Sequence, residues 1–206
     1  MKKRLPARIL IATRNQGKVR EIRDLVADLP VTFLSLDDVP DVPEVVEDAD
    51  TFEGNALKKA TILAQATGIP ALADDSGLCV DALGGRPGVH SARYAGEGAS
   101  DADRIAKLLN EMRDVPEQQR SARFVCALAL AWPDGKSKMF TGMCEGHITR
   151  EPRGVGGFGF DPVFYFPEAG CTFAEMNRQD KNQVSHRGKA LRQLAEYLTT
   201  LTPGQE

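Results

Sequence analysis

Residues suited to binding phosphate stand near the start of the chain, in the stretch LIATRNQGKVREI at positions 10–22. Gly17 and Lys18 lie between an apolar segment and a segment of helical periodicity, where backbone N–H groups and an ammonium can form an anion site. The P-loop spacing G-x-x-x-x-G-K-[ST] is absent, because Val19 follows Lys18 and no glycine stands five residues before Gly17. The stretch is therefore compatible with another kind of anion site or with an ordinary strand, turn and helix.

Carboxylates suited to a metal ion occur in two later segments. Asp74 and Asp75 follow the apolar segment IPALA, and several acids gather between positions 44 and 50. Adjacent carboxylates at a strand end suit Mg²⁺, which takes oxygen ligands and keeps several waters. The structural alternatives are a turn stabilised by the Asp74, Asp75 and Ser76 side chains, and a solvated acidic loop. The acids of the earlier segment are Glu44, Glu47, Asp48 and Asp50.

Groups that can contact a nucleobase lie in the last third of the chain. The glycines of GFGFDP allow a ligand to approach the backbone, and Phe158 and Phe160 can stack on a flat ring. A group of cations near the start of the last predicted helix favours an anion there. Taken singly, these residues are also typical of a core and of a solvated helix end. The cations are Lys181, His186, Arg187 and Lys189.

Together these clusters describe one ligand, a nucleoside triphosphate. Cations and N–H groups suit its phosphates, carboxylates suit magnesium, and aromatic rings suit its base. The sequence shows no Ser-His-Asp arrangement and no activated cysteine, so it does not indicate covalent catalysis. Attack of water on a metal-held phosphate is the simplest remaining chemistry.

The elements that must position these residues alternate between strand and helix. Residues 8–12 read as a short buried strand, and Val19, Ile22, Leu25, Val26 and Leu29 share one face of the helix that follows. A second helix gathers Leu57, Ala60, Leu63 and Ala64 and ends at Gly68. The segment IPALA predicts a second buried strand, and the glycine-rich stretch 74–96 predicts irregular turns.

The second half of the chain adds a hairpin to this pattern. Ser100 and Asp103 have capping-box spacing, and they open a third helix that buries Ile105, Leu108, Leu109 and Met112. The stretch 123–132 predicts a strand buried on both faces, which the turn 133–135 joins to a strand within 137–149. A short strand at 163–166 precedes a last helix that buries Leu191, Leu194, Ala195 and Leu198. We therefore predict a mixed α/β sheet.

Length, charge and cysteine content limit the classes of protein to which the chain can belong. A chain of 206 residues with 42% hydrophobic and 27% charged residues fits one compact domain. With 26 Lys and Arg against 29 Asp and Glu, no global basic field attracts nucleic acid. The four scattered cysteines indicate neither zinc nor redox chemistry. The apolar run near the N-terminus is too short for a signal or a membrane span, so we expect a soluble, cytoplasmic protein without membrane partners.

Five motifs in order resemble the inosine triphosphate pyrophosphatases, which hydrolyse ITP, dITP and XTP. They are TRNQGKVREI, TFEGNALKKA, ADDSGLCVDALGGRPGVHSARYAG, GGFGFDPVF and SHRGKAL, between about residues 9 and 198. The resemblance implies release of pyrophosphate from non-standard purine nucleotides, with Mg²⁺ as cofactor, and so a cleansing of the nucleotide pool. It also implies a homodimer and a two-lobed α/β fold with a long curved mixed sheet flanked by helices. Residues 1–206 would then form a single domain with the active site in the cleft between its lobes.

The resemblance also implies roles for particular residues. Asp75 would be the catalytic base and would hold Mg²⁺ with Glu47, and Asp74 would support them. The family often has two adjacent acids where this chain has Val46 and Glu47, so Glu44 and Asp48 stay open as metal ligands. The implied substrate-binding residues are Thr13, Arg14, Asn15, Gln16, Gly17, Lys18, Lys59, Ser76, Phe158, Gly159, Phe160, Asp161, Lys181, His186 and Arg187.

His186 and Arg187 would face the edge of the base in this interpretation. Their donors favour the 6-keto oxygen of inosine and xanthine, and leaving a buried donor unpaired beside adenine costs about 1–3 kcal/mol. Guanine shares the keto oxygen, and the sequence does not show how it is rejected. Two alternatives remain open: a pyrophosphatase for other modified nucleotides, and a nucleotide sensor without turnover. We further expect an Arg187→Ala variant to keep its stability, because Arg187 stands among polar residues at the start of an element.

Overall fold

The computed structural model describes residues 4–202. The chain forms two compact units. The first unit comprises the residues up to Asp75, residues 126–142 and the residues from Arg187 onward. The second comprises residues 76–125 and 143–186. Each unit has its own hydrophobic core.

A seven-stranded sheet has the strand order β2-β1-β3-β4-β5-β6-β7. The strand β1 pairs in parallel with β2 and β3, and β6 pairs antiparallel with β5 and β7. The predicted mixed α/β class is therefore confirmed. The strands are β1 (Arg8–Ile11), β2 (Thr32–Leu34), β3 (Ala71–Val80), β4 (Ser121–Ala131), β5 (Ser137–Ile148), β6 (Phe164–Phe166) and β7 (Cys171–Thr172).

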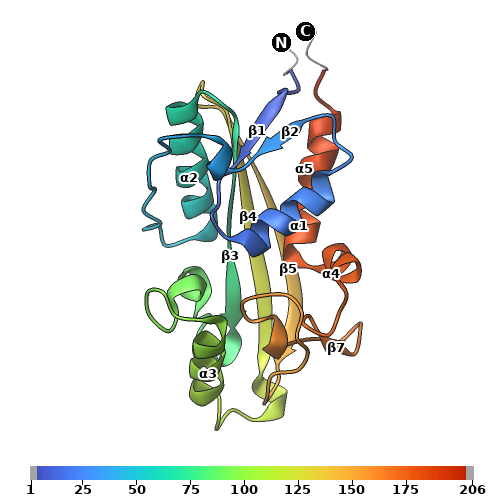
Figure 1. The fold of residues 1–206 in the computed structure, drawn as a ribbon. Coiled ribbons are helices and arrows are strands. Elements are labelled where there is room, and N and C mark those ends of the chain that lie inside the picture. Colours follow the sequence, from blue (N-terminus) through green and yellow to red (C-terminus); the bar gives the residue numbers. More distant parts are fainter. Residues whose placement is uncertain (1–3, 203–206) are drawn as a thin grey trace. The chain divides into compact units, whose positions relative to one another are not determined.

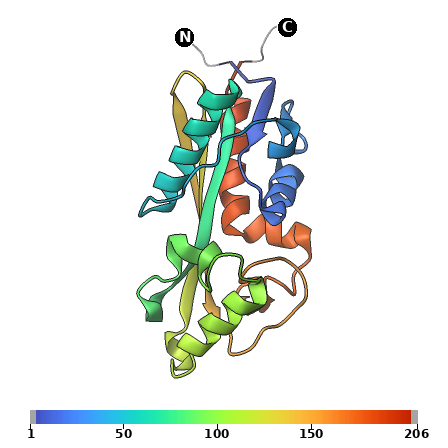
Figure 2. The ribbon, with the colours of Figure 1, turned by 60° about the vertical axis from the view of Figure 1, so that its left-hand side comes forward.

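The helices of the first unit lie on both faces of its strands. Figures 1 and 2 show α2 (Phe52–Thr67) on one side, and α1 (Gln16–Val26) and α5 (His186–Thr199) on the other. Its core joins apolar residues of α1 and α5 to those of the strands. Ile22, Leu72, Leu128, Leu191 and Leu194 are among its fully buried members.

Local sequence explains where these helices begin and end. The side chain of Asn15 accepts a hydrogen bond from the Lys18 N–H and caps α1, and Thr51 caps α2 in the same way. Gly68 ends α2 with a φ of 68°, a conformation that favours glycine. The predicted buried face of this helix is correct for Ala60, Leu63 and Ala64, whereas Leu57 is exposed.

The second unit contains α3 (Asp101–Glu111) and α4 (Arg178–Val184). The predicted Ser100–Asp103 capping box is present at the start of α3. Ile105 and Leu108 of this helix join a core rich in phenylalanine, which includes Phe124, Phe164 and Phe173. Leu109 is only partly buried. Short 3-10 helices occur at Leu36–Asp38, Asp81–Leu83, Gly88–Arg93, Glu117–Gln119 and Asp161–Val163.

Three expectations about the elements are wrong. The strand β3 does not end after IPALA but continues through Asp74, Asp75 and Ser76 to Val80. Strand pairing uses only backbone groups, so the strand tolerates carboxylates whose charge has partners. Lys181 does not lie near the start of the last helix but in α4, and Ala195 is only partly buried. Among the described residues, no helix is long and apolar enough to cross a membrane.

Candidate functional site

The loop between β1 and α1 presents polar groups of the first unit. The backbone N–H of Asn15 donates to the Thr13 hydroxyl at 3.2 Å, and that of Lys18 donates to the Asn15 side chain at 3.1 Å. Gly17 is buried, whereas Arg14 and Gln16 are exposed. These bonds shape the turn, and the Lys18 side chain extends to Asp74 of β3.

Two lysines from different helices meet at one backbone carbonyl. Lys18 of α1 and Lys59 of α2 donate to the carbonyl oxygen of Asp74 at 3.4 and 3.0 Å. This shared acceptor brings two ammonium groups together beside the strand that carries Asp75. The arrangement suits a ligand with several negative charges.

Asp74 is an ionised, fully buried carboxylate. Its Oδ1 lies 2.5 Å from Lys18 Nζ, its Oδ2 lies 2.8 Å from Arg187 Nε, and the Cys126 thiol donates to Oδ2 at 3.3 Å. Burial alone would raise the pKa of Asp74, but the charges of Arg187 and Lys18 hold this pKa well below its usual value. A carboxylate so strongly ionised is a poor proton acceptor, which suits Asp74 to a supporting role.

The neighbouring Asp75 has the opposite electrostatic environment. Burial raises the pKa of Asp75 to about 6, even though Lys18 and a hydrogen bond from Asn55 oppose the shift. The negative charge of Glu47 contributes to the rise in this pKa. The Asn55 amide donates to Asp75 Oδ2 at 3.0 Å. Two adjacent carboxylates with pKa values driven apart are typical of a site where one supports and the other accepts a proton.

The acidic segment contributes Glu47 to the same region. Glu47 forms a close ion pair with Lys59, and both line a hollow of about 200 Å³ together with Thr13, Arg14 and Glu44. Asp48 instead pairs with Lys58 at 2.5 Å and is largely exposed. Of these acids, Glu47 alone is among the groups that shift the pKa of Asp75. The geometry therefore favours Glu47 over Glu44 and Asp48 as a partner of Asp75.

These oxygen donors fit a hard divalent cation. A cation beside Asp75 and Glu47 would offset the burial and the mutual repulsion that raise the pKa of Asp75. Within residues 4–202, no group of three or more His, Cys, Asp and Glu side chains could hold a metal ion. A metal here would therefore need oxygens from water and substrate to complete its shell, as Mg²⁺ commonly does.

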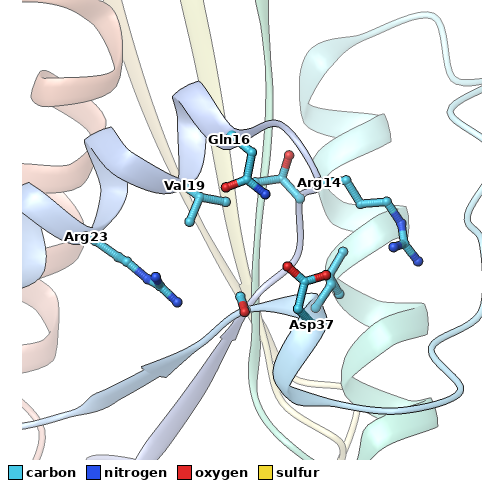
Figure 3. Close-up of a pocket in the computed structure, with 8 residues that line it drawn as sticks. Arg14, Gln16, Val19, Arg23 and Asp37 are labelled. Carbon is cyan, nitrogen blue, oxygen red and sulfur yellow. The ribbon is translucent and has the colours of Figure 1, made fainter.

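A smaller hollow also borders the loop between β1 and α1. Its volume is about 120 Å³, and Thr13 and Arg14 line it as well. Figure 3 shows Arg23 of α1 at one side, Asp37 near the other, and Arg14 leaving the loop toward α2. Arg14 therefore lines both hollows.

The glycine-rich loop of the second unit is held by carboxylates. The N–H of Phe158 donates to Asp161 at 2.9 Å, and the N–H of Gly159 donates to Asp101 at 2.7 Å. Lys181 is buried, lies 2.5 Å from Asp161 and stands 4.9 Å over the Phe158 ring. The structure thus brings together the sequence-predicted residues Phe158 to Asp161 and Lys181.

His186 and Arg187 have different surroundings from those expected for a solvated helix end. His186 is buried and stacks on Phe124, with 4.7 Å between the ring centroids. Arg187 is only 2% exposed and pairs with Asp74 and Glu21. The polar neighbours of Arg187 in the sequence therefore do not place it at the surface. Ser76 is partly buried within β3.

Sequence reasoning missed two polar residues of the first unit. Asn55 bonds to Asp75 and also accepts from the N–H of Ala49, so it ties the acidic segment to the carboxylate. Its spacing of four residues from Lys59 on one helix was a usable signal, because such residues share a face. Glu21, the buried partner of Arg187, had no comparable local signal.

The model of the Ham1 family matches residues 9–197. The chain belongs to this family. Among the relatives of this Ham1 chain, a "dITP/XTP pyrophosphatase" of Geobacter sulfurreducens is 56% identical over 93% of this chain and 96% of the relative. A second "dITP/XTP pyrophosphatase", of Thermus thermophilus, is 52% identical over 97% of this chain and 95% of the relative. A solved HAM1 protein from Coxiella burnetii has a TM-score of 0.86 and 45% identity, covering 93% of this chain and 98% of that one. These findings confirm the family resemblance read from the five motifs.

Proposed function

We propose that this Ham1-family protein is a nucleoside triphosphate pyrophosphatase. It hydrolyses the non-standard purine nucleotides ITP, dITP and XTP to the nucleoside monophosphate and pyrophosphate, and thereby cleanses the nucleotide pool. The observation that carries the proposal is the pair Asp74 and Asp75, whose pKa values are driven in opposite directions beside two lysines. The names of the relatives, dITP/XTP pyrophosphatase, support the substrate class.

Asp75 is the general base of this reaction. A carboxyl with a pKa of about 6 is largely ionised at neutral pH and can still accept a proton from water. The water oxygen forms a bond to the α-phosphorus, while the bond from that phosphorus to the oxygen bridging to the β-phosphate breaks. The electron pair leaves with pyrophosphate, and the proton of the water passes to Asp75. One water and one triphosphate thus give one monophosphate and one pyrophosphate.

Asp75 and Glu47 are the residues that would hold Mg²⁺. When bound, the ion supplies positive charge that neutralises the phosphate oxygens around the scissile bond. The raised pKa of Asp75, due to burial and in part to Glu47, supports this assignment, since a cation would relieve both causes. Glu47 forms an ion pair with Lys59 in the structure. The ammonium of Lys59 can therefore neutralise the Glu47 carboxylate when no cation is bound.

Lys18, Lys59 and the loop Thr13–Lys18 bind the phosphates in this proposal. The loop ends at the N-terminus of α1, where backbone N–H groups favour an anion. Asp74 positions the Lys18 ammonium through its own carboxylate at 2.5 Å. This contact fixes Lys18 near Asp75 before the substrate arrives, so less ordering is needed on binding.

Residues of the second unit bind the base. Phe158 to Asp161 form one wall, Lys181 supports it, and Ser76 and His186 contribute polar groups. The ion pair and ring contact of Lys181 hold the wall in place, which supports a fixed site for a flat ligand. The resemblance assigns Arg187 to the base edge as well. Its guanidinium is committed to Asp74 and Glu21, so that role requires an exchange of partners.

The proposal also includes a homodimer that acts on free nucleotides in the cytoplasm, as the family resemblance implies. A net charge of minus three supports a small-molecule substrate rather than nucleic acid. The test incubates the purified protein with Mg²⁺ and a panel of ITP, dITP, XTP, the standard nucleotides and modified pyrimidine nucleotides. The assay measures pyrophosphate and orthophosphate separately.

The expected result is pyrophosphate release that is fastest with ITP, dITP or XTP. Faster turnover of a modified pyrimidine nucleotide would favour the alternative pyrophosphatase. Orthophosphate as the first product would show a stepwise phosphatase. Binding without turnover would indicate a nucleotide sensor. Size-exclusion chromatography with light scattering measures whether the protein is a dimer in solution.

A further inference from the structure

One N–H group in the glycine-rich loop of the second unit has its acceptor outside the loop. The N–H of Gly159 donates to Asp101 Oδ2 at 2.7 Å, although 58 residues separate the two along the chain. The preceding N–H, that of Phe158, donates instead to Asp161, a residue of the loop itself. Asp101 therefore ties the loop to α3, a connection that the bond within the loop does not supply.

Asp101 is itself held in place. It is the first residue of α3. Its Oδ1 forms a close ion pair with Arg104, three residues further along the helix, and Arg104 also donates to the backbone carbonyl of Ala92. Because Arg104 takes one oxygen of the carboxylate, the other oxygen serves Gly159. The acceptor of the Gly159 N–H is thus anchored both by a helix and by a neighbouring 3-10 helix.

The backbone of the loop gains from such a hold, because glycines give it conformational freedom. Gly157 and Gly159 have φ values of 71° and 63°, which glycine adopts at little cost and can also leave readily. The peptide group is planar, so fixing the Gly159 N–H fixes the whole peptide that joins Phe158 to Gly159. On the other side of Gly159, Phe160 is only 3% exposed. The contact with Asp101 therefore limits the orientations open to the partly buried Phe158.

We propose that Asp101 is a positioning residue for base binding. It holds the Gly159 N–H, and thereby the wall of the base site, before the nucleotide arrives. The inference rests on the proposed pyrophosphatase function and adds to it a residue that acts through the loop rather than on the substrate. A loop that is already ordered loses less conformational freedom when the base binds, so the contact raises affinity for the nucleotide. The proposed phosphate-binding residues belong to the first unit, so affinity for phosphate alone should not depend on Asp101.

The variants that test this role are Asp101→Ala and Asp101→Asn, and the matched control is Asp103→Ala. Asp103 is a second acid in the first turn of α3, and it bonds to Ser100 at the helix cap. Its replacement removes the same charge from the same helix end and weakens the cap, so it measures the effect of a purely structural change there. A pyrophosphate assay gives kcat and KM with ITP, and calorimetry gives the affinity for inorganic tripolyphosphate. NMR measures the exchange of the Gly159 amide hydrogen with solvent.

In Asp101→Ala we expect KM for ITP to rise roughly 10-fold or more, on the scale of one lost hydrogen bond to a charged group. The fall in kcat should be smaller, because contacts to the base are made in the bound substrate and in the transition state alike. Asparagine keeps an acceptor oxygen for the Gly159 N–H, so Asp101→Asn should recover part of the loss. Exchange of the Gly159 amide should become faster in Asp101→Ala. Asp103→Ala should keep the KM and the exchange rate of the parent while its melting temperature falls, and tripolyphosphate affinity should be the same in all variants.

An unchanged KM in Asp101→Ala would overturn the inference. An equal rise in Asp103→Ala would also overturn it, because it would reveal a general effect of the helix end, and so would a parallel loss of tripolyphosphate affinity in Asp101→Ala. Absence of pyrophosphate release by the parent protein would contradict the proposed function instead. The Gly159 amide would still decide whether Asp101 holds the loop, since exchange as slow in Asp101→Ala as in the parent would exclude that role.

Discussion

The guanidinium Nε of Arg187 lies 2.8 Å from Oδ2 of Asp74, and both side chains are almost fully buried. The same guanidinium pairs closely with Glu21 of α1. Asp74 in turn holds Lys18, which stands three residues before Glu21 on that helix. Arg187 therefore links the last helix to β3 and α1, and its removal leaves two carboxylates buried with less compensation.

We predict that Arg187→Ala destabilises the protein by about 3–5 kcal/mol, the usual cost of breaking a buried ion pair by removing one partner. Urea unfolding measures the change in the free energy of unfolding. The control is Arg192→Ala on an exposed position of the same helix, which should change stability by less than about 0.5 kcal/mol. A loss below about 1 kcal/mol in Arg187→Ala would contradict the interpretation of Arg187 as a structural link.

This prediction replaces the expectation of unchanged stability drawn from sequence. That expectation rested on the polar neighbours of Arg187 along the chain, but its partners are distant in sequence: the bond to Asp74 spans 113 residues and that to Glu21 spans 166. Pairings of this kind depend on tertiary packing, which hydrophobic periodicity does not report. Local features such as the Ser100 capping box were predictable because donor and acceptor lie within one turn of helix.

In the candidate site, too, local features could be predicted from the sequence and tertiary contacts could not. Asp74, Asp75 and Lys18 were identified because their residue types, at positions where the sequence predicted that elements end or begin, suggested chemistry. The opposite pKa shifts of the two acids were not predictable, because the pKa of Asp74 depends on the charges of Arg187 and Lys18, and the pKa of Asp75 depends on its burial and, to a lesser degree, on Glu47. The length of β3 was also missed, since a strand carrying buried carboxylates breaks the apolar pattern.

Asn55 offers a test of how Asp75, the carboxylate proposed to bind the metal, is supported. Its amide bonds to Asp75 and to the backbone of Ala49 in the acidic segment. We predict that Asn55→Ala weakens the apparent affinity for Mg²⁺ by about 10- to 100-fold, the usual effect of removing a hydrogen-bond partner of a metal ligand. Initial rates at varied Mg²⁺ concentration measure this affinity. Asn110→Ala, at an exposed position of α3, should leave it unchanged; equal Mg²⁺ dependence in the two variants would refute the role of Asn55.

Asp75→Asn tests the general base. The amide keeps the size of the carboxyl but removes the charge proposed to hold Mg²⁺ and the lone pair proposed to accept the proton. General-base assistance is typically worth 10²- to 10⁴-fold, so we expect pyrophosphate release to fall by at least roughly a thousandfold once the metal contribution is added. A soundly folded variant that retains more than about a tenth of parent turnover would take this role away from Asp75.

The same variant should change how stability depends on pH in the presence of a chelator. Burial raises the pKa of Asp75 to about 6 in the folded state, above its usual value of 3.8. Between these values the folded parent binds more protons than the unfolded chain, so its free energy of unfolding falls as pH rises through this window. Asp75→Asn lacks this penalty, and its melting temperature relative to the parent should rise from pH 4 to pH 7. A constant difference across that range would show that Asp75 is not raised in pKa.

Lys181 provides the corresponding test for the base-binding loop of the second unit. Its ammonium lies 2.5 Å from Asp161, whose carboxylate also accepts from the Phe158 N–H, and it stands over the Phe158 ring. Replacing Lys181 with Met keeps most of its buried volume but leaves Asp161 without this cation, so the loop should lose its fixed geometry. If the loop binds the base, KM for ITP should rise about 10-fold or more, on the scale of one lost charged hydrogen bond.

Binding of inorganic tripolyphosphate should be unaffected in Lys181→Met, because it has no base to contact the loop. This readout separates base binding from a direct role of Lys181 on phosphate. Lys189→Met is the matched control, since Lys189 is exposed on α5. Parallel losses of ITP and tripolyphosphate binding in Lys181→Met would show that Lys181 contacts the phosphates. They would contradict the proposal that Lys181 supports a base-binding wall.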